Sequence, residues 1–313
     1  MNDQFWIGAA GVDVFFVISG FIIWQVSAGR ESSPAAFAWR RLTRVAPAYW
    51  LMTGLVAAIA LADPAFLPQV AVTPSHLALS LAFIQHLDPY GRAFPLLPPG
   101  WTLNYEALFY VIVAAALVAP GPARFAIVVA ALGAICAAGF IDPPLYGLGA
   151  NLMLLQFAAG AWLGRRRLLK RRIEPGAGLV FAALGLGFFA VLFVTGFHGG
   201  FWRELLRPFL WGVPAAMLVA GAVAVEDGWR LQVPRPLVRL GDASYAIYLC
   251  HLPATAFVAH ALGLRPAIAF VPAALAASLA AGLAFHFAVE KPLIAAFRAL
   301  PRASAPACRS AAP

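Results

Sequence analysis

Charged residues are scarce in this chain. Only 11% of its 313 residues are Asp, Glu, Lys or Arg, whereas 62% are hydrophobic. A soluble domain carries about 25% charged residues, so this composition excludes a water-soluble fold. The mean hydropathy of +0.83 predicts instead an all-α polytopic transmembrane helical bundle, with the lipid bilayer as its surroundings.

Cysteine pairs and cofactor motifs are also lacking. Cys136, Cys250 and Cys308 have no spacing typical of a disulfide framework or a metal site. No Gly-rich phosphate loop or nucleophile elbow occurs, so we expect no metal and no bound cofactor. The net charge of +9 would indicate nucleic acid in a soluble protein. Here the basic residues cluster between apolar runs, which indicates membrane orientation and no nucleic-acid partner.

Long apolar runs predict about nine membrane spans, because a helix crosses a bilayer with about 17–25 apolar residues. The predicted spans are 11–28, 46–62, 103–119, 123–140, 148–164, 177–196, 208–225, 242–262 and 267–288. A shorter run, 76–87, is typical of a re-entrant or interfacial segment. We expect outside loops at 68–74, 88–100, 142–146 and 198–207.

The basic residues predict the orientation of these spans. They gather at 30–44, 165–172 and 230–239, and lysine and arginine favour cytoplasmic loops. These three segments fall on one side only if 76–87 does not cross. We therefore expect an outside N-terminus and a cytoplasmic C-terminus.

The two ends of the chain carry weaker signals. Residues 1–300 are expected to form one transmembrane domain. The Ala-, Pro- and Ser-rich segment 301–313 predicts a disordered cytoplasmic tail. Residues 1–4 lack the basic leader of a cleavable signal peptide.

Arg40, Arg41 and Arg44 lie between the first two predicted spans. They have two interpretations. One is a topology signal, which is ordinary in membrane proteins. The other is an anion site, because Arg41 and Arg44 are three residues apart and share a helix face. The segment by itself favours the topology signal.

Two carboxylates fall within apolar runs, where an ionisable group is expensive. Glu106 shares a helix face with Thr102 and Phe109, so it either serves function or reaches water near the outer boundary. Asp13 stands near the start of the first span, where the helix dipole favours an acid. We therefore interpret Asp13 first as a dipole-stabilised residue.

A polar stripe follows one face of the predicted helix 242–262. Ser244, Tyr248, His251 and Thr255 are spaced by four, three and four residues, so the stripe either lines a cavity or bonds to a neighbouring helix. The other histidines show no supporting pattern. Glu290-Lys291-Pro292 is typical of an ordinary helix exit.

Five segments in order resemble the acyltransferase-3 family of integral membrane acyltransferases. They are GVDVFFVISGF at 11–21, RRLTRVAPAY at 40–49, WTLNYEALFY at 101–110, SYAIYLCH at 244–251 and EKP at 290–292. The resemblance covers nearly the whole chain. It implies transfer of an acyl group, often acetyl, from cytoplasmic acyl-CoA to a hydroxyl of a carbohydrate or glycolipid at the bacterial inner membrane.

The resemblance also implies that Arg41 and Arg44 engage the acyl-CoA donor, which agrees with the preference of arginine for phosphate. With it we expect two groups of site residues. The catalytic residues are expected to be Glu106 and His251. The substrate-binding residues are expected to be Arg41, Arg44, Ser244, Tyr248, Trp101 and Asp13.

One family segment has no counterpart in this sequence. The family begins with a helix that carries an arginine and, ten residues later, a histidine regarded as catalytic. We therefore expect the 313-residue form to be inactive and an upstream-extended form to be active. Two alternatives stay open: a non-catalytic relative that acts as a membrane partner, and a glycolipid transporter.

Overall fold

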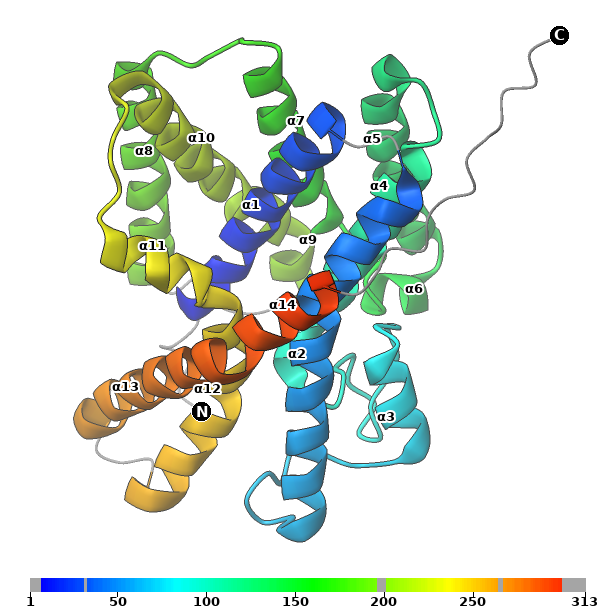
Figure 1. The fold of residues 1–313 in the computed structure, drawn as a ribbon, viewed down its shortest axis with the longest axis vertical. Helices are drawn as coiled ribbons and strands as arrows, with labels where there is room; N and C mark the ends of the chain where they lie inside the picture. The colour runs from blue at the N-terminus through cyan, green and yellow to red at the C-terminus, as the bar shows by residue number, and fades with distance from the viewer. Residues whose placement is uncertain (1–6, 31–32, 196–200, 264–266, 300–313) are drawn as a thin grey trace, which may run out of the picture.

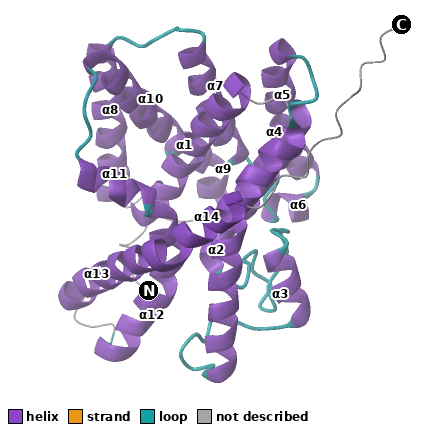
Figure 2. Cartoon of the chain, viewed as in Figure 1, coloured by secondary structure: helices purple, strands orange, loops and turns teal. Residues whose placement is uncertain are grey.

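Helices make up most of this protein (Figures 1 and 2). The computed structural model describes residues 7–30, 33–195, 201–263 and 267–299, and no strand occurs in these ranges. The prediction of an all-α membrane bundle is thereby confirmed. The helices that carry the argument below are α1 (Ile7–Arg30), α2 (Pro34–Ala62), α3 (Pro74–Leu81), α4 (Trp101–Ala116), α5 (Gly121–Ile141), α6 (Pro143–Gly147) and α7 (Leu154–Leu168).

The second half of the chain contains both long helices that could span a membrane and short helices. They are α8 (Pro175–Val194), α9 (Phe201–Leu210), α10 (Gly212–Trp229), α11 (Arg235–Asp242), α12 (Ser244–Leu262), α13 (Ala267–Phe285), the π-helical turn η3 (His286–Glu290) and α14 (Lys291–Ala299).

Seven helical segments of the described chain are long and apolar enough to cross a membrane. They are Ala10–Ala28, Pro34–Ala62, Gly121–Ile141, Pro175–Val194, Leu206–Trp229, Ser244–Leu262 and Ala269–Phe297. The other two predicted spans correspond to α4 and α7, which have only 16 and 15 residues. Gly149, at φ +105°, lies where a helix was expected to begin and delays the start of α7.

The basic segment predicted between the first two spans is itself helical. Ser33 caps the N-terminus of α2 by accepting a hydrogen bond from the Ala36 amide, and Pro34 follows at the first helical position. The helix then runs through the arginines and through Pro47 without a break. The expected start at residue 46 is therefore wrong by three turns. Helices α6 and α9 likewise occupy parts of the expected loops 142–146 and 198–207.

The sequence predicted that the short segment 76–87 does not cross the membrane, and the structure shows no spanning helix there. Helix α3 has eight residues, which extend about 12 Å. Two side chains of α2 hold its C-terminal end: the Tyr49 hydroxyl donates to the Ser80 carbonyl oxygen at 3.2 Å, and the Trp50 indole donates to that of Leu81 at 2.8 Å.

Helices α1 and α7 pack at close backbone distance. A Cβ on Gly160 would lie 2.0 Å from the Val17 carbonyl oxygen, and one on Gly20 would lie 2.2 Å from that of Phe157. Small residues permit such an approach between membrane helices. The Phe16 and Phe157 rings stack beside this contact with their centroids 4.6 Å apart.

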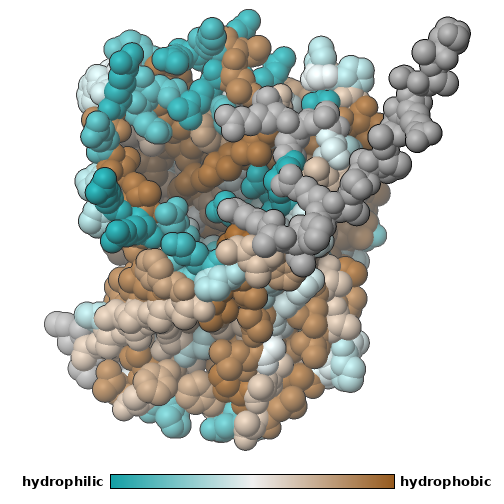
Figure 3. Space-filling view, viewed as in Figure 1, coloured by the Kyte–Doolittle hydropathy of each residue, from teal (hydrophilic) through white to brown (hydrophobic). Residues whose placement is uncertain are grey.

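Large apolar side chains cover much of the outer surface. Figure 3 shows them gathered over the lower part of the molecule, where α2, α12 and α13 lie. Examples are Leu51, Leu55 and Leu275, which are 50%, 50% and 61% exposed. A soluble protein would not expose so much apolar surface, so these faces are suited to contact lipid.

Candidate active site

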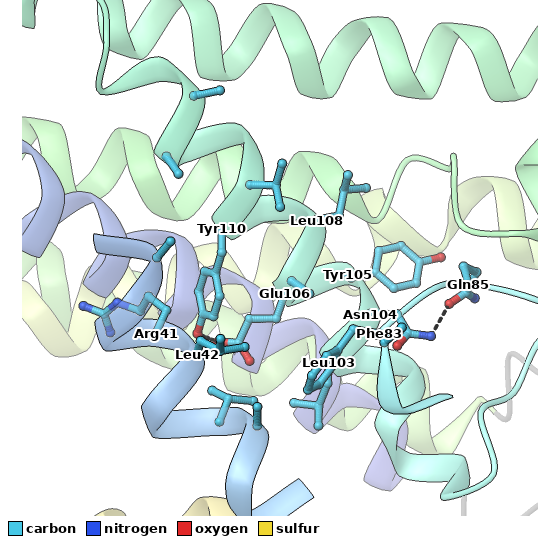
Figure 4. Close-up of a pocket in the computed structure, with 18 of the residues that line it drawn as sticks. Arg41, Leu42, Phe83, Gln85, Leu103, Asn104, Tyr105, Glu106, Leu108 and Tyr110 are labelled. Atoms are coloured by element: carbon cyan, nitrogen blue, oxygen red, sulfur yellow. Dashed lines mark hydrogen bonds between the residues drawn. The ribbon is translucent and has the colours of Figure 1, made fainter. Parts of the chain in front are cut away.

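A cavity of about 1100 Å³ lies beside α2 and α4. The two helices run in opposite directions, because Phe37 packs edge-on against Tyr110 at one end, whereas Tyr49 packs against Gly100 at the other. Most of the residues that line the cavity are apolar, and Leu108 is an example. The polar lining residues stand out against it in Figure 4: Arg41, Gln85, Asn104, Tyr105, Glu106 and Tyr110.

Glu106 is held in a fixed position within this lining. Its Oε1 atom accepts hydrogen bonds from the Ser19 hydroxyl of α1 at 2.9 Å and from the Tyr110 hydroxyl at 2.5 Å. The residue is only 8% exposed. The motif residue therefore faces the bundle and the cavity, and not the water of the outer boundary.

Arg41 lines the same cavity from α2. Its guanidinium lies 5.6 Å from the Phe37 ring centre, and its Nε atom is buried without a hydrogen-bond partner among the described residues. Arg44 is not among the described lining residues. Both arginines are close enough to Glu106 to interact with its carboxylate electrostatically. The structure thus brings Arg41, Arg44 and Glu106 together from segments 62 or more positions apart.

Asn104 and Gln85 form a polar pair that the sequence did not single out. The Asn104 amide Nδ2 donates to Gln85 Oε1 at 2.7 Å, and both residues line the cavity (Figure 4). Asn104 belongs to the same motif as Glu106, two residues before it. A neutral amide carries no charge signal, so only the structure reveals its position.

The polar stripe of α12 lies against the beginning of α4. The Tyr248 hydroxyl donates to the Pro99 carbonyl oxygen and lies 2.9 Å from Thr102 Oγ1. His251 Nδ1–H donates to the Tyr248 carbonyl oxygen of its own helix, and Ser244 is exposed. None of these three is among the described residues that line the cavity. Of the two interpretations of the stripe, bonding to a neighbouring helix is the one that Tyr248 shows.

Asp13 is a buried ion-pair partner. Its carboxylate accepts hydrogen bonds from Gln156 at 2.6 Å and Arg207 at 3.0 Å, and it is fully buried. Because α1 begins at Ile7, Asp13 lies in the second turn, where the dipole effect has faded. The dipole interpretation is therefore wrong. Trp101 packs edge-on against Phe16 and does not appear in the described lining.

The sequence analysis did not predict two buried or partly buried pairs that involve histidine. His286 Nδ1 lies 2.7 Å from Glu290 Oε2 across the π-helical turn, and Glu290 is only 4% exposed. The interpretation of Glu290-Lys291-Pro292 as an ordinary helix exit is therefore wrong, because Glu290 is a buried partner of His286.

The second pair joins two histidines. His76 Nδ1 lies 2.8 Å from His86 Nε2. Burial lowers the pKa of His76, and the neighbouring His86 adds to this effect. His76 and His86 are ten residues apart with a turn between them, so no helical spacing in the sequence indicated that they are neighbours.

The described residues contain no group of three His, Cys, Asp or Glu side chains that could hold a metal ion. The polar lining of the cavity consists of a guanidinium, a carboxylate, phenols and amides. Such groups bind anions and carbonyl oxygens, orient hydroxyls and move protons.

Comparison with known proteins places the chain among acyltransferases. The family model Acyl_transf_3, described as an acyltransferase domain, matches residues 3–287. The exopolysaccharide production protein ExoZ of Rhizobium meliloti is 38% identical over 306 residues, which are 95% of this chain and 93% of that protein. The O-acetyltransferase OatA of Staphylococcus aureus is 25% identical over 94% of this chain and 54% of its own length. No solved structure matches the chain.

Proposed function

Because the chain belongs to the acyltransferase-3 family, whose members are membrane acyltransferases, we propose that it transfers an acyl group from acyl-CoA to a polysaccharide hydroxyl. The observation that carries the proposal is the cavity in which Arg41 of α2 and Glu106 of α4 meet. The similarity to ExoZ and OatA supports an exopolysaccharide acceptor and an acetyl group.

Arg41 and Arg44 are proposed to bind the donor. Coenzyme A is a polyanion, and arginine presents a planar fork of donors that suits phosphate. The Nε–H of Arg41 has no partner among the described residues, so it can donate to a thioester or phosphate oxygen of acyl-CoA. Because acyl-CoA is cytoplasmic, this role favours a cytoplasmic position for the N-terminal half of α2 and an inner-membrane location. The cytoplasmic C-terminus stays a prediction from the basic segments.

The chemical step needs a base. The acceptor hydroxyl oxygen attacks the thioester carbonyl carbon, the carbon–sulfur bond breaks, and coenzyme A leaves as the thiol once it has received the hydroxyl proton. We assign proton transfer to Glu106, which lines the cavity. His251 is the second proposed catalytic residue, because the bond from its Nδ1–H leaves a lone pair on Nε2. Substrate contacts of Trp101, Ser244, Tyr248 and Asp13 stay predictions.

The proposal is tested by deleting the chromosomal gene and measuring ester-linked acetyl groups on the exopolysaccharide. Membranes from the deletion strain and from the complemented strain, which carries the wild-type gene, then receive radiolabelled acetyl-CoA. We expect the label to reach the polysaccharide in membranes of the complemented strain and to be absent from it in those of the deletion strain. Label that stays on acetyl-CoA in both strains would refute the proposed reaction.

Arginine variants test the donor site. Arg41→Ala and Arg44→Ala each remove a charge-assisted contact, so we expect the KM for acetyl-CoA to rise about tenfold or more. Arg239→Ala, on the exposed face of α11, is the matched control and should leave it unchanged. Undiminished transfer by Arg44→Ala at low acetyl-CoA would remove that residue from the donor site.

A further inference from the structure

Asn104 presents a buried hydrogen-bond acceptor that nothing in the described chain satisfies. Its side chain is 5% exposed, and its Oδ1 atom has no hydrogen-bond partner among the described residues. A buried polar atom without a partner costs free energy. Asn104 is one of the residues that line the cavity, so an unpartnered acceptor on its side chain is suited to bind a ligand.

Gln85 fixes which way this acceptor faces. The Asn104 Nδ2–H donates to Gln85 Oε1 at 2.7 Å, so the amide cannot turn without breaking that bond. Gln85 stands in the segment that follows α3, and the backbone there is tightly constrained: Phe83, two residues earlier, has φ +57°, which non-glycine residues rarely adopt. A strained and well-anchored segment beside a cavity is common at ligand-binding sites.

Asn104 and Arg41 stand at different positions along the cavity. Arg41 lies beside Tyr110, within the same α2–α4 contact as Phe37, whereas Asn104 lies in the first turn of α4, bonded to the segment after α3 (Figure 4). One position offers an unpartnered donor and the other an unpartnered acceptor. The lining as a whole is largely apolar, and Glu106 lies on α4 between Asn104 and Tyr110. This arrangement fits a substrate with an acceptor oxygen at one point and an O–H or N–H donor at another.

We propose that Asn104 is a substrate-binding residue whose Oδ1 accepts a hydrogen bond from a neutral O–H or N–H group, and that Gln85 is its positioning residue. The proposal rests on the proposed acyl transfer. The matching group is either a sugar hydroxyl of the acceptor or an amide N–H in the pantetheine arm of acyl-CoA. Both have the same chemistry, and kinetics separates them.

The test compares Asn104→Leu, which keeps the branched shape but loses both the acceptor and the donor to Gln85, with Asn104→Ser, which keeps an acceptor oxygen. KM and kcat are measured for acetyl-CoA and for chemically deacetylated exopolysaccharide. Loss of one neutral hydrogen bond should raise one KM about three- to tenfold in Asn104→Leu, less in Asn104→Ser, with kcat unchanged. A rise for the polysaccharide assigns the sugar hydroxyl, and a rise for acetyl-CoA assigns the amide.

Gln85→Met tests the positioning role. It leaves the Asn104 amide intact but free to rotate, so the same KM should rise by less than in Asn104→Leu. Ser278→Ala is the control, because this buried hydroxyl bonds to its own helix at Ala274 and should change neither constant. If Asn104→Leu does not fold, the Asn104→Ser and Gln85→Met variants carry the test.

Substrate-induced shifts in melting temperature separate this inference from the proposed function. A folded Asn104→Leu protein with both KM values unchanged overturns the inference, while wild-type transfer upholds the function. A wild type that transfers no acyl group but is stabilised by either substrate, with that stabilisation lost in Asn104→Leu, overturns only the function. A wild type with neither transfer nor stabilisation overturns both.

Discussion

The hydroxyl of Tyr110 donates to the same oxygen of Glu106 that the Ser19 hydroxyl of α1 contacts. Tyr110 stands one helical turn after Glu106 on α4, so one donor is local and the other comes from a different helix. Two fixed donors on one oxygen orient the carboxylate within the cavity lining. This relationship makes Tyr110 a positioning residue for the proposed base.

Tyr110→Phe is therefore expected to lower kcat. The change removes a hydrogen bond to a carboxylate, a contact worth about 1.5–3 kcal/mol, which corresponds to a rate loss of about ten- to a hundredfold if the bond forms in the transition state. Initial rates at saturating substrate measure it. Tyr90→Phe is the control, because Tyr90 is 58% exposed and lies in the segment before α4. A Tyr110→Phe enzyme with wild-type kcat would show that Glu106 needs no such orientation.

The His76–His86 pair predicts a pH-dependent stability. The pKa of His76 lies below its ordinary value of 6.5 because burial disfavours the charged ring; His86 and Arg92 add repulsion, and Asp88 partly offsets it. The unfolded chain therefore binds a proton at a higher pH than the folded protein does. The stabilising contribution is complete above about pH 6.5 and is lost as the pH falls below it.

Melting temperatures of the purified protein between pH 4.5 and 7.5 would check this expectation. His76→Gln removes the titrating ring, so its melting temperature should fall less than that of the wild type over the acidic part of the range. His260→Gln, at an exposed position near the end of α12, should keep the wild-type slope. Parallel curves for His76→Gln and the wild type would contradict the assignment.

The close contact of α1 with α7 predicts that Gly160 tolerates no side chain. A Cβ there would lie 2.0 Å from the Val17 carbonyl oxygen, so Gly160→Ala must push the helices apart. Overpacking of this kind costs about 1–3 kcal/mol. Thermal unfolding in detergent should show a lower melting temperature than that of Gly54→Ala, whose Cβ would meet nothing within 4 Å. Equal melting temperatures would show that the helices separate at little cost.

Several features followed from the sequence because they depend on local chemistry. Composition and apolar run length specify a helical membrane protein, since every backbone polar group in lipid must be bonded within its own helix. The run at 76–87 was predicted not to cross because it is too short to span the bilayer and because the basic segments then fall on one side. Ordered motifs around Arg41, Glu106 and His251 indicated the family. These signals are contained in single segments, so no contact between segments was needed to read them.

Only the tertiary structure decided which polar groups share a cavity. Arg41 and Glu106 stand 65 positions apart, and Asn104 is bonded to Gln85, which lies in another segment. The α12 stripe could face a cavity or a helix equally well by spacing, and its contact with Pro99 and Thr102 resolved the choice for Tyr248. Periodicity fixes the face of a helix on which a residue lies. The packing of the whole bundle fixes what that face meets.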